Sequence, residues 1–345
     1  MKKILLAGYY GFGNLGDEAI LEMAIKQILE ITDRENITVL SGSKEVTRKK
    51  YNINTIDRYN VFSIIAGLMK SDALVFGGGS LLQDITSKRS IHYYLFLIRL
   101  AKIIMLSQGI GPIVSENSKN AVKNTLKHID YMTVRDKYSK EFLENLGMDK
   151  NKIFLSTDPV INLRAGENHL TVHNGKKKVC FSLRNWKDAN VSQKISTLTE
   201  RLIKNDIECC FIPFYYNEDL ELINEVEKNI GDKAVYYKER LTTNDAFDII
   251  RDMDVMVGVR LHSLIFAAAA NVPFAAVSYD HKVDHFVNSL NMKVVCSIDN
   301  IDTDALYDEI MDKISNEGVE KMKLSEGVDE LRELTKINYK ILKEL

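Results

Sequence analysis

The chain has 345 residues, of which 45% are hydrophobic and 27% are charged, and its formal net charge is −2. This length suits two domains of ordinary size, and the near-zero charge gives no reason to expect a nucleic-acid partner. The four cysteines lie in apolar stretches without a Cys-x-x-Cys pair, so reduced core cysteines are favoured over a disulfide framework or a metal site. No signal peptide and no apolar run of membrane-spanning length is visible, so we expect a soluble, cytoplasmic protein.

Short apolar runs alternate with amphipathic helical patterns along almost the whole chain, which is typical of parallel sheets. In the first half the strand candidates are 3–8, 37–40, 73–76, 103–107, 131–134 and 153–156. In the second half they are 179–183, 208–213, 255–258, 274–278 and 293–296, and an amphipathic helix is expected over 328–345. We predict an α/β fold with two Rossmann-like, doubly wound parallel-sheet domains facing a cleft, the arrangement called GT-B.

The domain boundaries follow from the change in composition after residue 165. We expect an N-terminal domain over 1–165, and we assign to it the binding of an acceptor substrate. A polar, lysine-rich linker without periodicity follows over 166–178. We expect a C-terminal domain over 179–325, and we assign to it the binding of a donor substrate. A C-terminal helix covers 326–345.

A glycine-rich turn, GYYGFGNLGDE over residues 8–18, follows the first strand and matches G-x-G-x-x-G. A dinucleotide site is disfavoured, because the second strand ends without an acidic residue and Asp17 and Glu18 would repel a pyrophosphate. One alternative is a tight turn in which Asp17 or Glu18 caps the helix. It leaves three aromatic rings unexplained, those of Tyr9, Tyr10 and Phe12. Rings beside a carboxylate are typical of a sugar site, which we predict here.

Two further strands of the first half run into glycines, GGGS over 77–80 and QGIGP over 108–112. Three glycines with a serine can form a backbone nest or allow a substrate to approach closely. Ordinary strand-to-helix turns are the alternative for each run taken singly. Several such strand ends in one domain favour a shared cleft, and we assign Gly78 and Gly79 to the donor.

Basic residues stand at the carboxyl ends of four predicted strands: Arg135, Arg184, Arg260 and Lys282. Arginine binds carboxylate or phosphate through two parallel hydrogen bonds, and lysine adds a mobile charge. Solvated surface charge is the usual alternative for any one of them, but four at one topological position favour an anion site. His262 could be a satisfied core histidine, yet its place beside Arg260 at a strand-to-helix turn favours an acid/base role.

With these motifs the chain resembles the polysaccharide pyruvyl transferase family, in particular its bacterial cell-surface branch. The likeness is carried by the runs 8–18, 77–80 and 108–112, by VRD over 134–136, by TDP over 157–159 and by GVRLHS over 258–263. The resemblance implies a GT-B-like fold, phosphoenolpyruvate as donor and a ketal-linked pyruvate on a sugar as product. For the cell-wall branch it implies a lipid-linked disaccharide that contains N-acetylmannosamine as acceptor.

The resemblance also implies roles for particular residues. The donor positions are Arg135, Arg260, His262 and Lys282, and the acceptor contacts are Tyr10 and Phe12. We add Arg184 to the donor side by its position and chemistry, and Asn14 to the acceptor side. In this hypothesis His262 is the general acid/base, and Asp17 orients or deprotonates the acceptor hydroxyl. Glu18 is the second candidate for the role of Asp17.

No cofactor beyond phosphoenolpyruvate as co-substrate and no metal is expected, since no His/Asp/Glu grouping has good ligand spacing. A glycosyltransferase with a nucleotide-sugar donor is the main alternative, with Asp280 or Asp284 as partner of the nucleoside. A non-catalytic carbohydrate-binding protein is disfavoured, because sugar binding alone needs few cations.

A lipid-linked acceptor would require transient contact at the inner face of the membrane. The segments 61–70 and 93–102 are apolar and flanked by basic residues, but we interpret both as buried helices. Nothing in the sequence indicates the oligomeric state.

Overall fold

The computed structural model describes residues 1–84, 88–127, 129, 131–164, 175–186 and 189–345. The chain forms two compact units. Unit 1 comprises Met1–Phe12, Asp17–Pro159 and Leu331–Leu345, and unit 2 comprises Gly13–Gly16 and Val160–Glu330. Most of the predicted linker, 166–178, lies outside the described residues.

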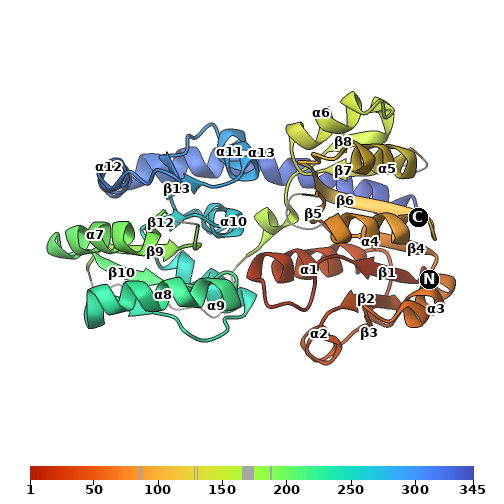
Figure 1. The fold of residues 1–345 in the computed structure, drawn as a ribbon, viewed down its shortest axis with the longest axis horizontal. Helices are drawn as coiled ribbons and strands as arrows, with labels where there is room; N and C mark the ends of the chain where they lie inside the picture. The colour runs from red at the N-terminus through yellow and green to blue at the C-terminus, as the bar shows by residue number, and fades with distance from the viewer. Residues whose placement is uncertain (85–87, 128, 130, 165–174, 187–188) are drawn as a thin grey trace. The chain divides into compact units, whose positions relative to one another are not determined.

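Within its described residues, unit 1 holds an eight-stranded sheet of order β3-β2-β1-β4-β6-β7-β8, with β5 paired to β6. Its strands are β1 (Ile4–Ala7), β2 (Ile37–Ser41), β3 (Asn54–Asp57), β4 (Ala73–Phe76), β5 (Gly79–Leu82), β6 (Ile103–Ile110), β7 (Met132–Val134) and β8 (Ile153–Leu155). The pairs are parallel. The helices around this sheet are α1 (Leu15–Ile28), α2 (Lys44–Tyr51), α3 (Val61–Lys70), α4 (Lys88–Ile98), α5 (Glu116–Leu126) and α6 (Lys137–Asn145) (Figure 1).

Inner strands of unit 1 such as β1 and β4 are apolar runs because helices cover both of their faces. In β1 and β4 every residue is buried. The side chains of Leu5 and Phe76 share a core with Leu68 of α3 and Tyr94 of α4. The strand order reverses between β1 and β4, so the turns that follow these two strands lie at the topological switch point, where open parallel sheets bind ligands.

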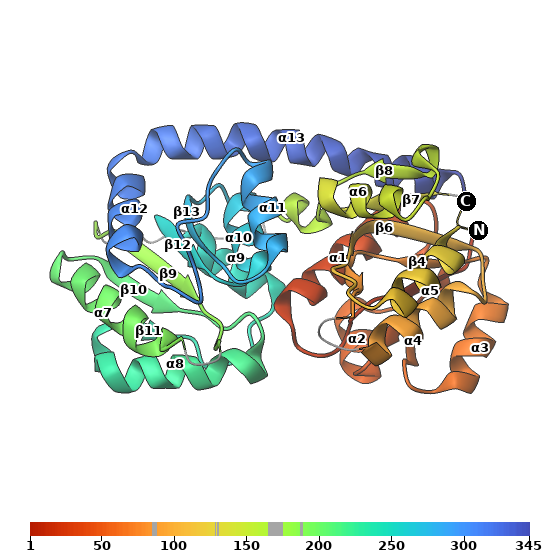
Figure 2. The same cartoon turned by 45° about the horizontal axis from the view of Figure 1, so that its top comes forward.

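Unit 2 repeats this plan with a six-stranded parallel sheet of order β11-β10-β9-β12-β13-β14 within its described residues. Its strands are β9 (Lys178–Ser182), β10 (Glu208–Phe211), β11 (Val235–Tyr236), β12 (Val255–Gly258), β13 (Phe274–Ser278) and β14 (Cys296–Ser297). The helices are α7 (Val191–Lys204), α8 (Tyr216–Ile230), α9 (Thr243–Arg251), α10 (Leu261–Ala269), α11 (His281–Ser289), α12 (Thr303–Ser315) and α13 (Glu317–Lys343) (Figure 2). The short 3-10 helices of the two units are η1 (Arg34–Asn36), η2 (Lys150–Lys152), η3 (Pro159–Asn162) and η4 (Gly231–Lys233). The switch point of unit 2 lies between β9 and β12.

The last helix contributes to both units, because Leu331–Leu345 belongs to unit 1. There, buried Asn338 donates to Ser107 Oγ at 2.9 Å and accepts from Thr133 Oγ1 at 2.6 Å. Ser107 has a φ of 49°, a left-handed conformation that non-glycine residues rarely adopt. The helix therefore holds an irregular residue in the middle of β6.

The fold class is confirmed: the chain is mixed α/β with two parallel sheets. The predicted strands reappear with small shifts, except that 293–296 is wrong in extent, because only Cys296 and Ser297 pair with β13. Three strands were not predicted, β3, β5 and β11, which are short or polar. The final helix starts at Glu317 rather than at 328, since its glycines at 318 and 327 did not interrupt it.

The interpretation of 61–70 as a buried helix is wrong for one side of α3. Ile64 and Leu68 are buried, but Phe62 and Met69 are 88% and 84% exposed. No helix among the described residues is both long and apolar enough to span a bilayer.

Candidate functional site

The glycine turn after β1 and the segment after β12 meet inside unit 2. A Cβ atom at Gly16 would lie 2.0 Å from Nδ1 of His262, so only glycine leaves room for the imidazole. The backbone N–H of Leu15 donates to the carbonyl of Phe214 at 2.8 Å, and Asn14 forms a bridge with Tyr215. The glycine at position 16, the third of the G-x-G-x-x-G match, therefore leaves the space that His262 of the GVRLHS run occupies.

His262 stands in the first turn of α10, and Arg260 is the residue before the helix. The strand β12 ends at Gly258, so both side chains project from the carboxyl end of a strand beside the switch point of unit 2. His262 is partly exposed, as an acid/base group that meets a ligand must be. His262 thus lies at a strand-to-helix turn, and its acid/base role stays a prediction.

The rings of the glycine turn divide into one buried ring and two at the surface. Tyr10 is buried, and its ring occupies the space beside Gly8 and Gly77, where a Cβ atom would collide with it. Burial raises the pKa of Tyr10 well above its ordinary value. The predicted acceptor contact at Tyr10 therefore needs correction, because this ring packs inside unit 1. Phe12 is partly exposed and stacks on Tyr9 with 4.3 Å between ring centroids.

Arg58, a residue that the sequence did not single out, holds this pair of rings. Its guanidinium carbon lies 5.1 Å from the ring centroid of Phe12 and 5.7 Å from that of Tyr9. The same buried side chain donates to the carbonyl of Gly8 at 2.9 Å and to the hydroxyl of Tyr94 at 3.0 Å. Burial lowers the pKa of Arg58, but the hydroxyls of Tyr94, Tyr93 and Tyr59 together outweigh burial, and the pKa is raised. The sequence did not predict Arg58 as a site residue, because Arg58 follows β3, a polar strand that the hydrophobic pattern does not reveal.

The two acids of the turn have different surroundings. Glu18 Oε1 accepts the N–H of Gly11 at 2.8 Å, and burial raises the pKa of Glu18. Glu18 thus stabilises the glycine turn through Gly11, which precedes α1, and this hydrogen bond is not a helix cap. Asp17 lies near the second glycine run instead, since a Cβ atom at Gly79 would be 3.7 Å from its Oδ1. Gly78 and Gly79 have φ values of +129° and +87°, which favour glycine strongly.

Arg135 follows β7 and belongs to the same part of unit 1. Its Nη2 donates to Ser80 Oγ at 3.0 Å, at the end of the glycine run. Its Nη1 lies 3.7 Å from Asp158 Oδ2, and its Nε lies 3.5 Å from Asp136 Oδ2. The Asp158 side chain is buried. The charge of Arg135 is therefore balanced by carboxylates of unit 1, and its predicted role toward a donor stays a prediction.

Arg260 is ion-paired in a similar way within unit 2. Its Nε and Nη2 donate to Asp219 Oδ1 at 3.2 and 2.5 Å, and Nη2 also donates to Glu218 Oε2 at 2.8 Å. Asp219 in turn accepts the N–H groups of Phe214 and Tyr215. Burial lowers the pKa of Arg260, but these carboxylates outweigh it and raise the pKa above its ordinary value. Burial raises the pKa of Asp219, against the effect of Arg260.

Arg184 and Lys282 come together over one aromatic ring. The Arg184 guanidinium carbon lies 4.7 Å from the ring centroid of Tyr279, and Lys282 Nζ lies 5.0 Å from it. Trp186 completes the group, 5.6 Å from Arg184 and edge-on to Tyr279. Within the described part of the chain, Arg184 has no ion pair, and Lys282 lies 3.5 Å from Asp280 Oδ2. Rings thus support two cations whose charge is only partly balanced.

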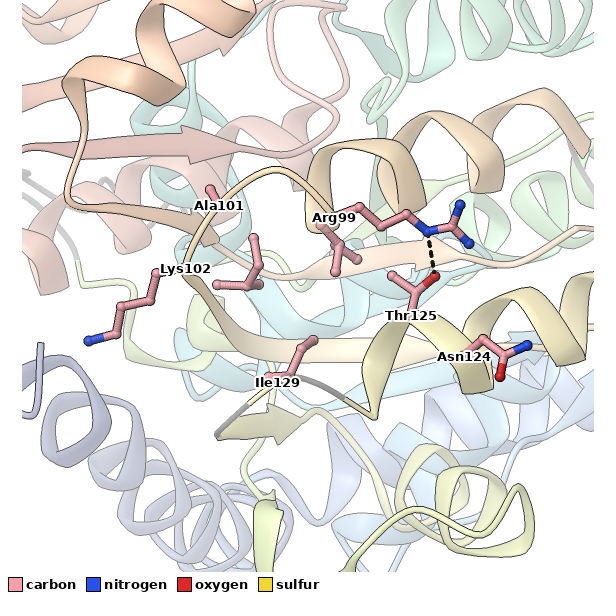
Figure 3. A pocket seen from close by; sticks show the side chains of 8 residues that line it. Arg99, Ala101, Lys102, Asn124, Thr125 and Ile129 are labelled. Atoms are coloured by element: carbon pink, nitrogen blue, oxygen red, sulfur yellow. Dashed lines mark hydrogen bonds between the residues drawn. The ribbon is translucent and has the colours of Figure 1, made fainter.

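A pocket of about 520 Å³ lies elsewhere in unit 1, at the amino end of β6. Figure 3 shows Arg99 reaching toward Thr125 at one side of this pocket and Lys102 extending away at the other. It contains none of the predicted site residues. Among the described residues, no group of three or more His, Cys, Asp and Glu could hold a metal ion.

Comparison with known proteins identifies relatives of this chain. Amylovoran biosynthesis protein AmsJ of Erwinia amylovora is 21% identical over 246 residues, which cover 62% of this chain and 58% of that protein. The match thus spans less than two thirds of that relative.

Solved structures resemble this chain in fold. The UDP co-structure of MnaA from S. aureus has a TM-score of 0.66 at 14% identity and covers 94% of this chain and 91% of its own. Anabaena HepE in complex with UDP and glucose has a TM-score of 0.66 at 9% identity over 100% of both chains. A glycosyltransferase from Rickettsia africae has a TM-score of 0.64 at 15% identity over 99% and 98%. These neighbours place the fold among GT-B-type glycosyltransferases and epimerases.

The sequence profile described as polysaccharide pyruvyl transferase matches residues 14–281, from the glycine turn through β13 and into α11. That span is more than half of the chain and includes Gly16, Arg135, Arg260 and His262. The chain belongs to the polysaccharide pyruvyl transferase family.

Proposed function

We propose that the protein transfers pyruvate from phosphoenolpyruvate to two hydroxyls of one sugar in a lipid-linked cell-surface glycan precursor. The product is a cyclic pyruvate ketal, and phosphate is released. N-acetylmannosamine is the proposed acceptor sugar, following the resemblance to the cell-wall branch of the family. Pyruvate transfer to a polysaccharide is the coarser statement that family membership supports.

The observation that carries the proposal is the pair of cations over Tyr279, in the same unit as His262. Phosphoenolpyruvate carries a carboxylate and a phosphate, so its binding calls for several cations whose charge is not already balanced. Arg184 and Lys282 fit that requirement, because aromatic rings support them and carboxylates balance them only in part. We assign them to the donor.

Arg260 would join them by exchanging one partner for the donor. Buried Asp219 accepts hydrogen bonds from Nε and Nη2 of Arg260. Glu218, which is 50% exposed, accepts a further hydrogen bond from the same Nη2. A donor anion could take the place of Glu218 without disturbing the buried pair. Arg135 stays a predicted donor residue from the resemblance, with a charge that Asp136 and Asp158 balance.

The chemistry needs one proton donor and one proton acceptor. Protonation of the methylene carbon of phosphoenolpyruvate makes the adjacent carbon electrophilic, and a sugar hydroxyl attacks it as its proton is removed. Phosphate leaves with its bonding electron pair, and a second hydroxyl of the same sugar closes the ketal and loses its proton. We assign general acid/base work to His262 and orientation or deprotonation of the acceptor to Asp17.

The acceptor side is assigned to the Tyr9–Phe12 stack, Asn14 and Asp17. Stacked rings offer an apolar face to the C–H groups of a sugar, and Arg58 fixes that face in unit 1. Glu18 has less freedom for this role, because its carboxylate accepts the N–H of Gly11.

The test is incubation of the protein with phosphoenolpyruvate and a synthetic lipid-diphosphate disaccharide that ends in N-acetylmannosamine. The expected product is heavier by one pyruvate minus one water, and one phosphate is released for each product. A parallel reaction replaces phosphoenolpyruvate with UDP-sugars. Sugar transfer from those donors, with no pyruvyl product, would replace the proposal by the glycosyltransferase alternative.

A further inference from the structure

The outer side of α3 is apolar over its full length. Phe62 and Met69 are among the most exposed large apolar side chains of the chain, and Val61 and Ile65 are exposed with them. Residues three, four and seven positions apart lie on one face of an α-helix, so these four side chains form a single stripe. The opposite side of the helix packs into the core of unit 1.

The next helix over the same core also has exposed apolar side chains. Phe96 of α4 and Leu100, just after that helix, are both more than 40% exposed. The two helices contribute to the same core and lie next to each other in both views (Figures 1 and 2). We call the α3 stripe together with Phe96 and Leu100 the α3 face. An exposed apolar stripe of this kind marks an interaction site more often than scattered single residues do.

The charges at the end of the α3 face are mainly positive. Lys70 closes α3, and Lys102 comes just before β6, which pairs with β4, the strand that follows α3. Arg99, in contrast, donates to Thr125 of α5 (Figure 3). The acid nearest in sequence is Asp72, whose carboxylate accepts the N–H of Lys3 at 2.7 Å. From Val61 to Met69 the helix carries no charged residue.

We propose that the α3 face docks onto the surface of an anionic lipid membrane. Its apolar side chains would enter the boundary between headgroups and acyl chains, while Lys70 and Lys102 would meet lipid phosphates. The positive edge suits lipid phosphates better than a second copy of this chain, because two α3 faces in contact would bring like charges together.

The inference rests on the proposed function in one respect: docking brings unit 1 to the surface where a lipid-linked acceptor is anchored. None of the residues of the α3 face belongs to the proposed donor or acceptor groups. Docking and catalysis can therefore be measured separately.

The test is co-sedimentation of the full chain with vesicles of phosphatidylcholine and phosphatidylglycerol at about three to one. The variant Phe62→Ser/Met69→Ser removes the two most exposed side chains of the stripe. The matched control is Val319→Ser/Met322→Ser, an exposed apolar pair of α13 in unit 2. We expect the α3 variant to lose about tenfold or more in vesicle affinity, while the control binds like the parent chain.

A charge variant, Lys70→Gln/Lys102→Gln, is expected to weaken binding to these vesicles and to have little effect with phosphatidylcholine alone. Absence of vesicle binding by the parent chain, or equal loss in the α13 control, would overturn the proposal. So would a dimer of the parent chain that dissociates in Phe62→Ser/Met69→Ser, because a second copy would then cover the face.

Pyruvyl transfer to a saccharide without a lipid keeps the two proposals apart. The α3 variant is expected to retain this transfer in full. Transfer without vesicle binding would remove the docking proposal alone, and vesicle binding without transfer to any acceptor would remove the proposed function alone.

Discussion

Arg135 of unit 1 and Arg184 of unit 2, each just after a strand, have opposite surroundings. In unit 1, Arg135 is ion-paired with Asp136 and buried Asp158 and donates to Ser80, so its charge is already balanced. In unit 2, Arg184 lies over the rings of Tyr279 and Trp186. Carboxylates fix a guanidinium in place but neutralise it, whereas rings support it and leave its charge to an incoming anion.

Unit 2 also contains an arginine that carboxylates hold in place. Arg260 is held by buried Asp219 and by exposed Glu218, at the same switch point as Arg184. The comparison therefore predicts that anchored and ring-supported cations respond differently to substitution. It also predicts that the chemistry depends on unit 2, where His262 stands.

The largest effect is expected for His262→Gln, which removes the proposed acid/base group. The rate of phosphate release should fall by about 10²–10⁴. The control is His281→Gln, an exposed histidine of α11 in the same unit, which should keep the parent rate. Trp186 is the single tryptophan of the chain, so its fluorescence reports whether unit 2 stays folded. An unchanged rate in folded His262→Gln would remove His262 from the chemistry.

The next effect is expected for Asp219→Ala, which leaves the Arg260 guanidinium buried without its anchor. Breaking a buried pair by removing one partner costs about 3–5 kcal/mol, so the urea midpoint of Trp186 fluorescence should drop sharply. Glu218→Ala removes the exposed partner of the same guanidinium and should cost about 1 kcal/mol or less. Equal losses in the two variants would contradict the distinction between an anchor and an exchangeable partner.

A smaller effect, confined to binding, is expected for Arg184→Gln. Loss of charge-assisted hydrogen bonds to the donor should weaken phosphoenolpyruvate binding about tenfold or more, measured by titration of Trp186 fluorescence. The matched control is Arg201→Gln. Arg201 also lies over an aromatic ring, with its guanidinium carbon 3.6 Å from the ring centroid of Tyr307, a residue of a different helix. If both variants bind the donor like the parent chain, ring support does not mark the anion site.

The smallest effect is expected for Glu317→Gln, in a partly exposed network. Hydrogen bonds from Lys177 and Lys321 lower the pKa of Glu317 from 4.5 to about 2. A lowered carboxyl pKa stabilises the fold above pH 4.5, and this stabilisation disappears as the pH falls toward 2. Because the three side chains are about one third exposed, the loss at neutral pH should be about 1 kcal/mol.

The pH dependence of the urea midpoint separates this network from an ordinary surface pair. Glu317→Gln should differ from the parent chain near neutral pH and converge with it in acid. Glu333→Gln breaks the exposed Glu333–Lys336 pair of the same helix and should change the midpoint by less. A difference between Glu317→Gln and the parent chain that grows in acid would contradict the assignment.

The sequence predicted the features that depend on local pattern. Buried parallel strands are continuous apolar runs, so β4, β12 and β13 could be located to the residue. Strands such as β3, with the polar sequence NTID, carry no such signal and were missed. Because the carboxyl ends of parallel strands share one edge, the placement of Arg184, Arg260 and Lys282 at strand ends followed from the strand positions alone.

Which side chains of the glycine turn are buried was decided only by the tertiary structure. Adjacent residues of a turn point in different directions, so the sequence could not tell buried Tyr10 from partly exposed Phe12. Tyr94 and Gly8 lie 36 and 50 residues from Arg58, and Asp219 lies 41 residues from Arg260, so no local pattern encodes these partners. Contact between Gly16 and His262 joins the two ends of the family profile, and only the folded chain brings them together. Local periodicity thus determined the strands and their ends, while packing over long sequence separations determined which charges are balanced.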